Sequence, residues 1–229
     1  MASKLKANLS QIYGWVGEFL KAHPEMAVLP VAGDQVILEG AFKFRINVQN
    51  QQTFSDEFEL KIAIPNDFPD NLPMVFEIAG RIPVDGNFHV NPGDQSLCLG
   101  SPLRLMDLLS KNKSLCGFVE TCLVPYLYSV ATHQRGGERF EYGELAHGKA
   151  GLITDYKELF EVDDEDGVVW WLTLLTFKKR LANKQACIEC SSRVIGRCRH
   201  KKKLNHFLSL SNRGWFKDQL ASLMSRSLP

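Results

Sequence analysis

The sequence predicts an α+β fold, in which an antiparallel sheet is flanked by helices and followed by a small helical region. Three observations predict it. Apolar residues recur at helical spacing near the N-terminus, alternate with polar residues in two central segments, and return to helical spacing after residue 114. The composition, with 45% hydrophobic and 23% charged residues among 229, is that of a folded globular protein and excludes a disordered chain.

The first elements in order are a helix over residues 4–22 and two strands. The helix ends before His23-Pro24, and its apolar face consists of Leu5, Leu9, Ile12, Val16, Phe19 and Leu20. Residues 42–48 and 58–64 alternate apolar and polar side chains, as strands with one buried face do. The polar residues 49–52 suit the connection between these strands.

The middle of the chain contains a turn, a short strand and a long connection. Residues 65–73 are too rich in proline for a helix or a central strand and predict an ordered turn, and residues 74–78 predict a further strand. Residues 79–101 then form a connection with several glycines and prolines. Connections of this length are uncommon in compact domains unless they are functional.

Helices are predicted for most of the remaining chain. Helical patterns cover Leu115 to Tyr126, Asp155 to Phe160 and Leu204 to Met224, the last broken near Asn212, while residues 170–177 pack as a helix or a strand. An acidic surface turn at residues 163–167 precedes the helical, basic last part of the chain. We therefore expect one domain over residues 1–160 and a helical region over residues 168–229.

Charge is distributed unevenly along the chain. Ten basic residues and one acidic residue lie from Lys178 to Lys203, so this stretch carries +9 and the remainder −8. Such density could attract phosphates or an acidic protein surface. Because no aromatic residues are interleaved with the basic ones, we favour protein docking over nucleic-acid binding.

The sequence predicts a cytoplasmic protein that does not enter a membrane. No run approaches the 18 or more consecutive apolar residues of a spanning helix, and the N-terminus lacks the apolar core of a secretion signal. In a reducing compartment the six cysteines are not expected to form disulfides.

A cluster of cysteines lies inside the basic stretch. Cys187, Cys190, Cys198 and His200 supply three thiolates and one imidazole, the donor set of a tetrahedral structural zinc site, and His206 is a reserve fourth ligand. Such a small knuckle cannot bury a core alone, so zinc would supply its folding energy. It resembles short zinc-binding tails such as the SEC-C motif. The alternative is a loop of free thiols.

Two local motifs resemble those of ubiquitin-conjugating enzymes. Ile64-Pro65, Phe68-Pro69 and Pro73-Met74-Val75-Phe76 resemble that family's strand, Tyr-Pro turn and next strand. Phe88-His89-Val90-Asn91 with Ser96-Leu97-Cys98-Leu99 resembles its His-Pro-Asn motif and downstream cysteine, although Val90 replaces the proline and the interval to Cys98 is shorter. The resemblance covers residues 4–131 and implies a sheet and helices of ubiquitin-conjugating type.

The resemblance implies an acyltransferase that works through a cysteine thioester. Cys98 would be the nucleophile, because a thiolate both attacks a carbonyl and leaves readily. Asn91 would stabilise the oxyanion of the transfer step through its side-chain amide. His89 would brace the loop. No glycine-rich phosphate loop follows a strand, so activation of the acyl group is expected on another protein.

Within this superfamily the chain looks most similar to divergent bacterial members found in CBASS-type antiviral defence operons. The segment Gly143 to Gly148 and the cysteine-rich tail carry that similarity. It implies that the passenger protein is a partner nucleotidyltransferase of the cyclic-oligonucleotide class and that target lysines accept it. Two alternatives remain: a catalytically silent binding module of the same fold, and a nucleic-acid-binding protein built on the zinc knuckle.

Overall fold

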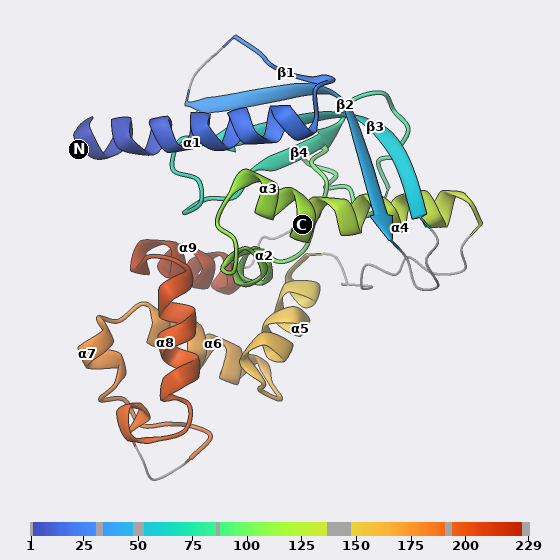
Figure 1. Cartoon of the computed structure of the whole chain (residues 1–229). Coiled ribbons are helices and arrows are strands. Elements are labelled where there is room, and N and C mark those ends of the chain that lie inside the picture. Colours follow the sequence, from blue (N-terminus) through green and yellow to red (C-terminus); the bar gives the residue numbers. More distant parts are fainter. Residues whose placement is uncertain are drawn as a thin grey trace. The chain divides into compact units, whose positions relative to one another are not determined.

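The computed structural model describes residues 2–30, 34–47, 53–85, 88–136, 148–190 and 194–225, with the backbone alone for residues 2–8 (Figure 1). The predicted connection at residues 49–52 and the segment Gly143 to His147 lie outside these ranges. The helices are α1 (Ala2–Ala22), α2 (Pro102–Leu109), α3 (Leu115–Phe118), α4 (Val124–Gln134), α5 (Gly148–Phe160), α6 (Glu165–Leu175), α7 (Lys179–Ala182), α8 (Lys201–Leu210) and α9 (Arg213–Met224). The strands are β1 (Met26–Val28), β2 (Gln35–Asn47), β3 (Thr53–Pro65) and β4 (Met74–Glu77).

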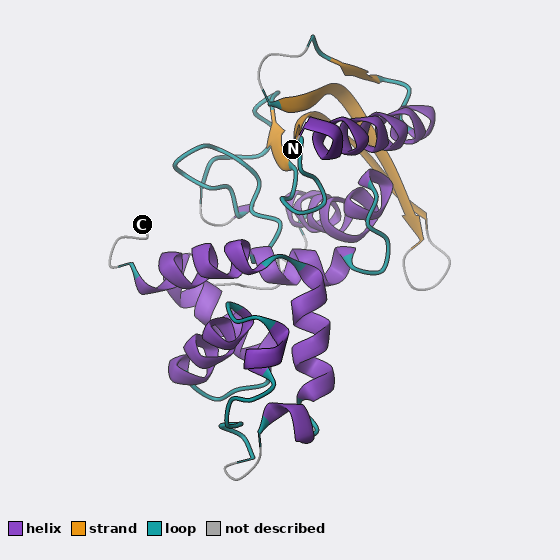
Figure 2. Cartoon of the chain, turned by 90° about the vertical axis from the view of Figure 1, so that its left-hand side faces the viewer, coloured by secondary structure: helices purple, strands orange, loops and turns teal. Residues whose placement is uncertain are grey.

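The chain divides into two compact units. Unit 1 comprises residues 1–100 and 111–144, and unit 2 comprises residues 101–110 and 145–229. All described strands belong to unit 1, whereas the described elements of unit 2 are helical (Figure 2). This confirms the predicted α+β class, with an antiparallel sheet and several helices.

Unit 1 is built on a four-stranded antiparallel sheet in the order β1-β2-β3-β4. Phe42 pairs with Phe58 and Leu38 with Ile62, so the alternating apolar residues of both long strands share one buried face. Ile12, Val16 and Phe19 of the predicted apolar face of α1 are buried as well, and the Phe19 ring stacks on Phe42 with centroids 6.3 Å apart. The strand alternation and the helical face therefore form one core.

The edge strand β1 requires a glycine opposite it. Met26 of β1 pairs with Gly40 of β2, where the backbone φ is +141°. A Cβ atom at residue 40 would lie 2.3 Å from the carbonyl oxygen of Glu25. Both the backbone conformation and the close approach exclude a side chain at this position.

The second helical region of unit 1 is one continuous stretch that changes pitch. α3 leads into a π-helical turn, η2 (Val119–Leu123), and then into α4, with Pro125 in the first turn of α4. This stretch, Leu115 to Gln134, is long and apolar enough to cross a membrane, yet 61% of its most apolar window is buried inside the structure. It therefore has the burial of a core helix.

Unit 2 packs around a cluster of aromatic side chains. Phe160 of α5 lies against Trp171 of α6 and Phe207 of α8, with ring centroids 5.7 Å and 4.9 Å apart. All three side chains are buried. The short helix α2 joins this unit because Arg104 pairs with Asp155 of α5, whose side chain is only 2% exposed.

The observed division differs from the expected boundaries of 1–160 and 168–229. α5 belongs to unit 2, because Tyr156 and Phe160 contribute to the aromatic cluster of that unit. The acidic segment is not a boundary either. Asp164 caps the N-terminus of α6, its carboxylate accepting a hydrogen bond from Gly167 N over 2.8 Å.

Candidate active-site loop and metal centre

The segment that carries Cys98 lies beside the last strand of the sheet. Leu97 N donates to Val75 O of β4 over 2.8 Å, and Val90 forms an antiparallel bridge with Leu97. Cys98 N donates to His89 O over 2.7 Å. The fold thus brings the backbones of two predicted site residues, His89 and Cys98, together on one loop.

His89 shapes this loop through its backbone. Its φ of 51° lies in the left-handed region, which is uncommon for a residue other than glycine but is tolerated by histidine more often than by most residues. The carbonyl oxygen of the preceding Phe88 accepts a hydrogen bond from the Tyr126 hydroxyl over 2.7 Å. The loop is therefore anchored to α4 just before it turns.

The third predicted site residue, Asn91, is held within the same loop. Its backbone N–H donates to Ser96 O over 2.8 Å, and its side-chain Nδ2 donates to Ser96 Oγ over 2.9 Å. Ser96 Oγ in turn donates to Asp94 Oδ1 over 2.7 Å, and hydrogen bonds from Ser96 lower the pKa of the Asp94 carboxyl. Among the described contacts, the amide of Asn91 is joined to Ser96 and not to Cys98.

The thiol of Cys98 lies between two buried neighbours. Leu97 and Leu99 are buried, whereas Cys98 is partly exposed. Burial raises the pKa of the Cys98 thiol, and a hydrogen bond involving the Gly100 backbone opposes this rise. The resting thiol is therefore protonated near neutral pH, and nucleophilic attack would require a base or a partner that stabilises the thiolate.

Four predicted metal ligands lie together in unit 2. The ligand atoms of Cys187, Cys190, Cys198 and His200 all lie within 4.8 Å of one another and could hold a metal ion. His200 Nδ1 lies 3.2 Å from Cys187 Sγ and 3.7 Å from Cys190 Sγ. Cys187 and His200 are buried, and burial raises the pKa of the Cys187 thiol to about 11. A bound cation would favour its thiolate instead.

Local backbone contacts bring these ligands together. Ala186 and Val194 form an antiparallel bridge, and Ile195 N donates to Gln185 O over 2.9 Å, so the two arms of the knuckle run side by side. The 3₁₀ turn η3 (Ile195–Arg197) then leads to Cys198, and His200 is the N-cap residue of α8. The cluster therefore depends on backbone pairing as well as on the cysteine spacing. The reserve ligand His206 lies elsewhere, with Nε2 2.5 Å from Asp107 Oδ1 of α2.

The ring of His200 is oriented by a carboxylate that the sequence analysis did not identify. Glu189 Oε2 lies 3.0 Å from His200 Nε2. Arg199 Nε donates to the same ring nitrogen over 3.1 Å. A metal ion bound at Nδ1 would instead place the ring hydrogen on Nε2, from which it would be donated to Glu189. Glu189 was visible in the sequence only as the single acid of the basic stretch.

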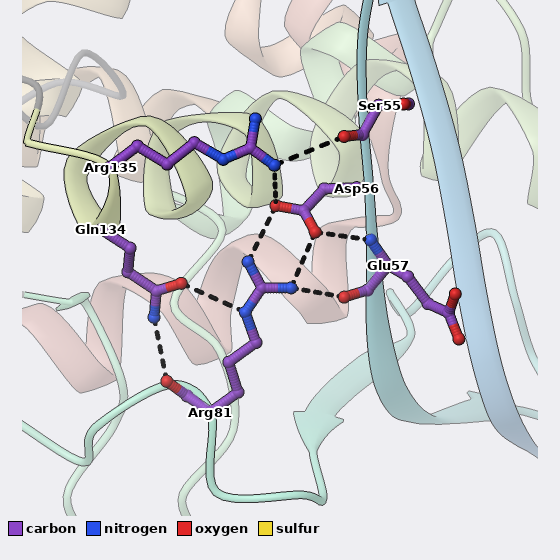
Figure 3. Close-up of polar contacts among 6 residues, drawn as sticks. All are labelled: Ser55, Asp56, Glu57, Arg81, Gln134 and Arg135. Atoms are coloured by element: carbon purple, nitrogen blue, oxygen red, sulfur yellow. Dashed lines mark hydrogen bonds and ion pairs between the residues drawn. The ribbon is translucent and has the colours of Figure 1, made fainter.

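A partly exposed ion-pair cluster holds the beginning of the long connection in unit 1 (Figure 3). Arg81 donates to both carboxylate oxygens of Asp56 over 2.9 and 2.8 Å, and Arg135 lies 3.0 Å from the same carboxylate. The Arg81 guanidinium also lies 3.9 Å from the Phe58 ring centroid. Hydrogen bonds from Arg81 hold the pKa of the Asp56 carboxyl below its usual range. Sequence reasoning missed this cluster because its members lie far apart in the chain.

The chain was also compared with known proteins. Neither models of protein families, nor curated proteins, nor solved structures give a match.

Proposed function

We propose that this chain is a cysteine acyl carrier of ubiquitin-conjugating type, with Cys98 as the nucleophile. The observation that carries the proposal is the position of Cys98, on a loop bridged to β4 and shared with His89 and Asn91. The order of α1, an antiparallel four-stranded sheet, a long loop and further helices also supports it, because the resembled family has this order. The other cysteines of unit 1, Cys116 and Cys122, lie on the helical stretch after this loop.

The proposed reaction has two steps. The Cys98 thiolate attacks the activated C-terminal carbonyl of a passenger protein, forming a thioester while the leaving group of the donor departs. A lysine amine then attacks the thioester, the C–S bond breaks, an amide forms, and the proton released by the amine returns to the thiolate or to solvent. Since burial raises the pKa of the Cys98 thiol, the activating partner would have to favour the thiolate.

The passenger proposed from the resemblance is a nucleotidyltransferase of the cyclic-oligonucleotide class, conjugated during antiviral defence of CBASS type in the cytoplasm. A second candidate, a catalytically silent binding module, is favoured by two features of the loop. The amide of Asn91 is engaged with Ser96, and the Cys98 thiol is protonated at rest. The two candidates differ in whether Cys98 forms a thioester that lysine can discharge.

We also propose that the metal at the four-residue cluster is zinc and that its role is structural. Three thiolates and one imidazole match zinc's ligand preference, and four protein ligands leave no open coordination position for substrate. The metal would stabilise the knuckle between α7 and α8. It would take no part in the thioester step.

Transthioesterification from a synthetic donor tests the carrier function without the natural partners. The full chain is incubated with a glycine-terminated peptide thioester, and the adduct is detected by intact mass before and after reduction. We expect a thiol-sensitive adduct that Cys98→Ala abolishes, and the adduct should discharge to free lysine. Cys116→Ala is the matched control, because Cys116 is also a partly exposed free thiol whose pKa is raised by burial. An adduct that survives Cys98→Ala, or one that lysine cannot discharge, would favour the binding module.

A further inference from the structure

Unit 2 contains a groove that is separate from the metal cluster. It has a volume of about 540 Å³, within the range of roughly 300–1,000 Å³ that is usual for ligand sites. The groove lies where the end of α6, the start of α7, the second half of α8 and the α8–α9 turn meet. Its lining residues are Phe177, Lys178, Lys179, Asn205, Leu208, Ser209, Ser211, Asn212 and Arg213.

The charge of this lining is exclusively positive. Lys178, Lys179 and Arg213 are exposed, and the described lining residues include no carboxylate. Within the described ranges, none of these three cations forms an ion pair, whereas Glu161 and Glu165 of unit 2 pair with Lys203 and Lys149. An anion in the groove would therefore meet cations that are not neutralised by the protein.

The same groove offers an apolar surface and polar atoms. Phe177 and Leu208 are half-buried and line it. The Oδ1 of Asn205 and the Oγ of Ser211 are buried and have no hydrogen-bond partner among the described residues. An aromatic ring beside several cations is the combination that single-stranded nucleic acids use, with phosphates on the cations and a base on the ring.

We propose that this groove binds single-stranded nucleic acid, with phosphates at Lys178, Lys179 and Arg213 and a base against Phe177. Exposed basic residues continue beyond the groove, at Arg180 and Lys184 and at Lys201 and Lys202 of α8. The positive surface is therefore longer than one phosphate needs and suits a strand. An acidic protein surface would match the cations but would not need the aromatic and amide lining.

The structure also explains why the basic stretch looked unsuited to nucleic acid. No aromatic residue is interleaved with its basic residues, but Phe177 directly precedes it and lines the groove together with Lys178. The third groove cation, Arg213, lies ten residues beyond Lys203, just after the α8–α9 turn.

Fluorescence anisotropy with a labelled oligothymidine tests the proposal on the full, metal-loaded chain. Lys178→Gln, Lys179→Gln and Arg213→Gln should each weaken binding about three- to tenfold at low salt and lower the slope of log affinity against log salt by about 0.7. Phe177→Leu should weaken binding about tenfold with little change in that slope. Lys21→Gln, an exposed lysine of α1 in unit 1, is the charge-matched control and should leave binding unchanged.

Two results would overturn the proposal. The first is that the groove variants and Lys21→Gln all bind oligothymidine with the same affinity as the parent chain. The second is equal competition by a polyglutamate peptide together with no effect of Phe177→Leu, which would assign the surface to an acidic protein partner. Thermal melting of each variant shows that altered binding does not come from unfolding.

Discussion

His200 Nε2 lies 3.0 Å from Glu189 Oε2, while Nδ1 of the same ring faces the thiols of Cys187 and Cys190. With a metal ion bound at Nδ1, Nε2 would carry the ring hydrogen and donate it to this carboxylate, which would fix the orientation of the ring. Glu189 would thus be a positioning residue for a metal ion held by this cluster.

Removing this carboxylate should weaken metal binding without removing a ligand. Glu189→Ala should lower zinc affinity about 10- to 100-fold, measured by competition with a chromophoric chelator. Glu165→Ala removes a paired but more exposed carboxylate of the same unit and should leave the affinity unchanged. Equal affinities of Glu189→Ala and the parent chain would show that the ring is oriented by its packing alone.

Loss of the metal should unfold the knuckle. Elemental analysis should find about one zinc per chain, and Cys190→Ser or chelation should release it and lower the melting temperature. We expect the Cys98 thiol to react with a thiol reagent at the same rate before and after chelation, because the four clustered residues all belong to unit 2. A change in Cys98 reactivity would show that the two units unfold together, and a metal-free chain with a protease-resistant knuckle would contradict the zinc site.

Asn91 should act on discharge of the thioester more than on loading. Asn91→Ala should leave the adduct with the peptide thioester visible and slow its discharge to lysine about 10²-fold, because the oxyanion develops when the amine attacks. Ser96→Ala removes the partner of the Asn91 amide and is the control for loop bracing. If both variants slow loading and discharge equally, Asn91 serves the shape of the loop.

The Asp56 cluster should make unit 1 sensitive to acid. Because the folded pKa of Asp56 is depressed, its stabilisation is present above the unfolded value of about 3.9 and is lost as the pH falls through the folded pKa. Asp56→Asn should therefore lower the free energy of unfolding by about 1–2 kcal/mol at pH 7, and the difference should shrink below about pH 4. Urea titrations at several pH values measure this. Asp70→Asn, which removes an exposed carboxylate, is the control and should not lower the free energy of unfolding in this way.

The periodic parts of the fold could be predicted from the sequence. The helix near the N-terminus, the two long strands and the break before Arg213 follow from local spacing, and the structure confirms them. The gathering of Cys187, Cys190, Cys198 and His200 is also confirmed, because ligand spacing is a local property. The nature of the bound metal and the roles of Cys98, Asn91 and His89 stay predictions.

Tertiary pairing could not be predicted in the same way. Helix α2 was missed although Ser101-Pro102 is a start signal, with Ser101 Oγ accepting from Arg104 N over 3.3 Å. Its place in unit 2 depends on the pairing of Arg104 with Asp155, which no local pattern indicates. The expected boundary near residue 160 was displaced for the same reason.

The position of α2 in unit 2 affects how the chain folds as it is made. The helix ends at Leu109, whereas its packing partners in α5 and α8 end at Phe160 and Leu210. At about 5–20 residues per second, synthesis of α8 is completed roughly 5–20 s after α2. During that interval the apolar side chains of Leu103 and Met106, which are buried in the finished structure, have no unit 2 core to cover them. Helix α2 is therefore expected to complete its packing only after α8 has emerged from the ribosome.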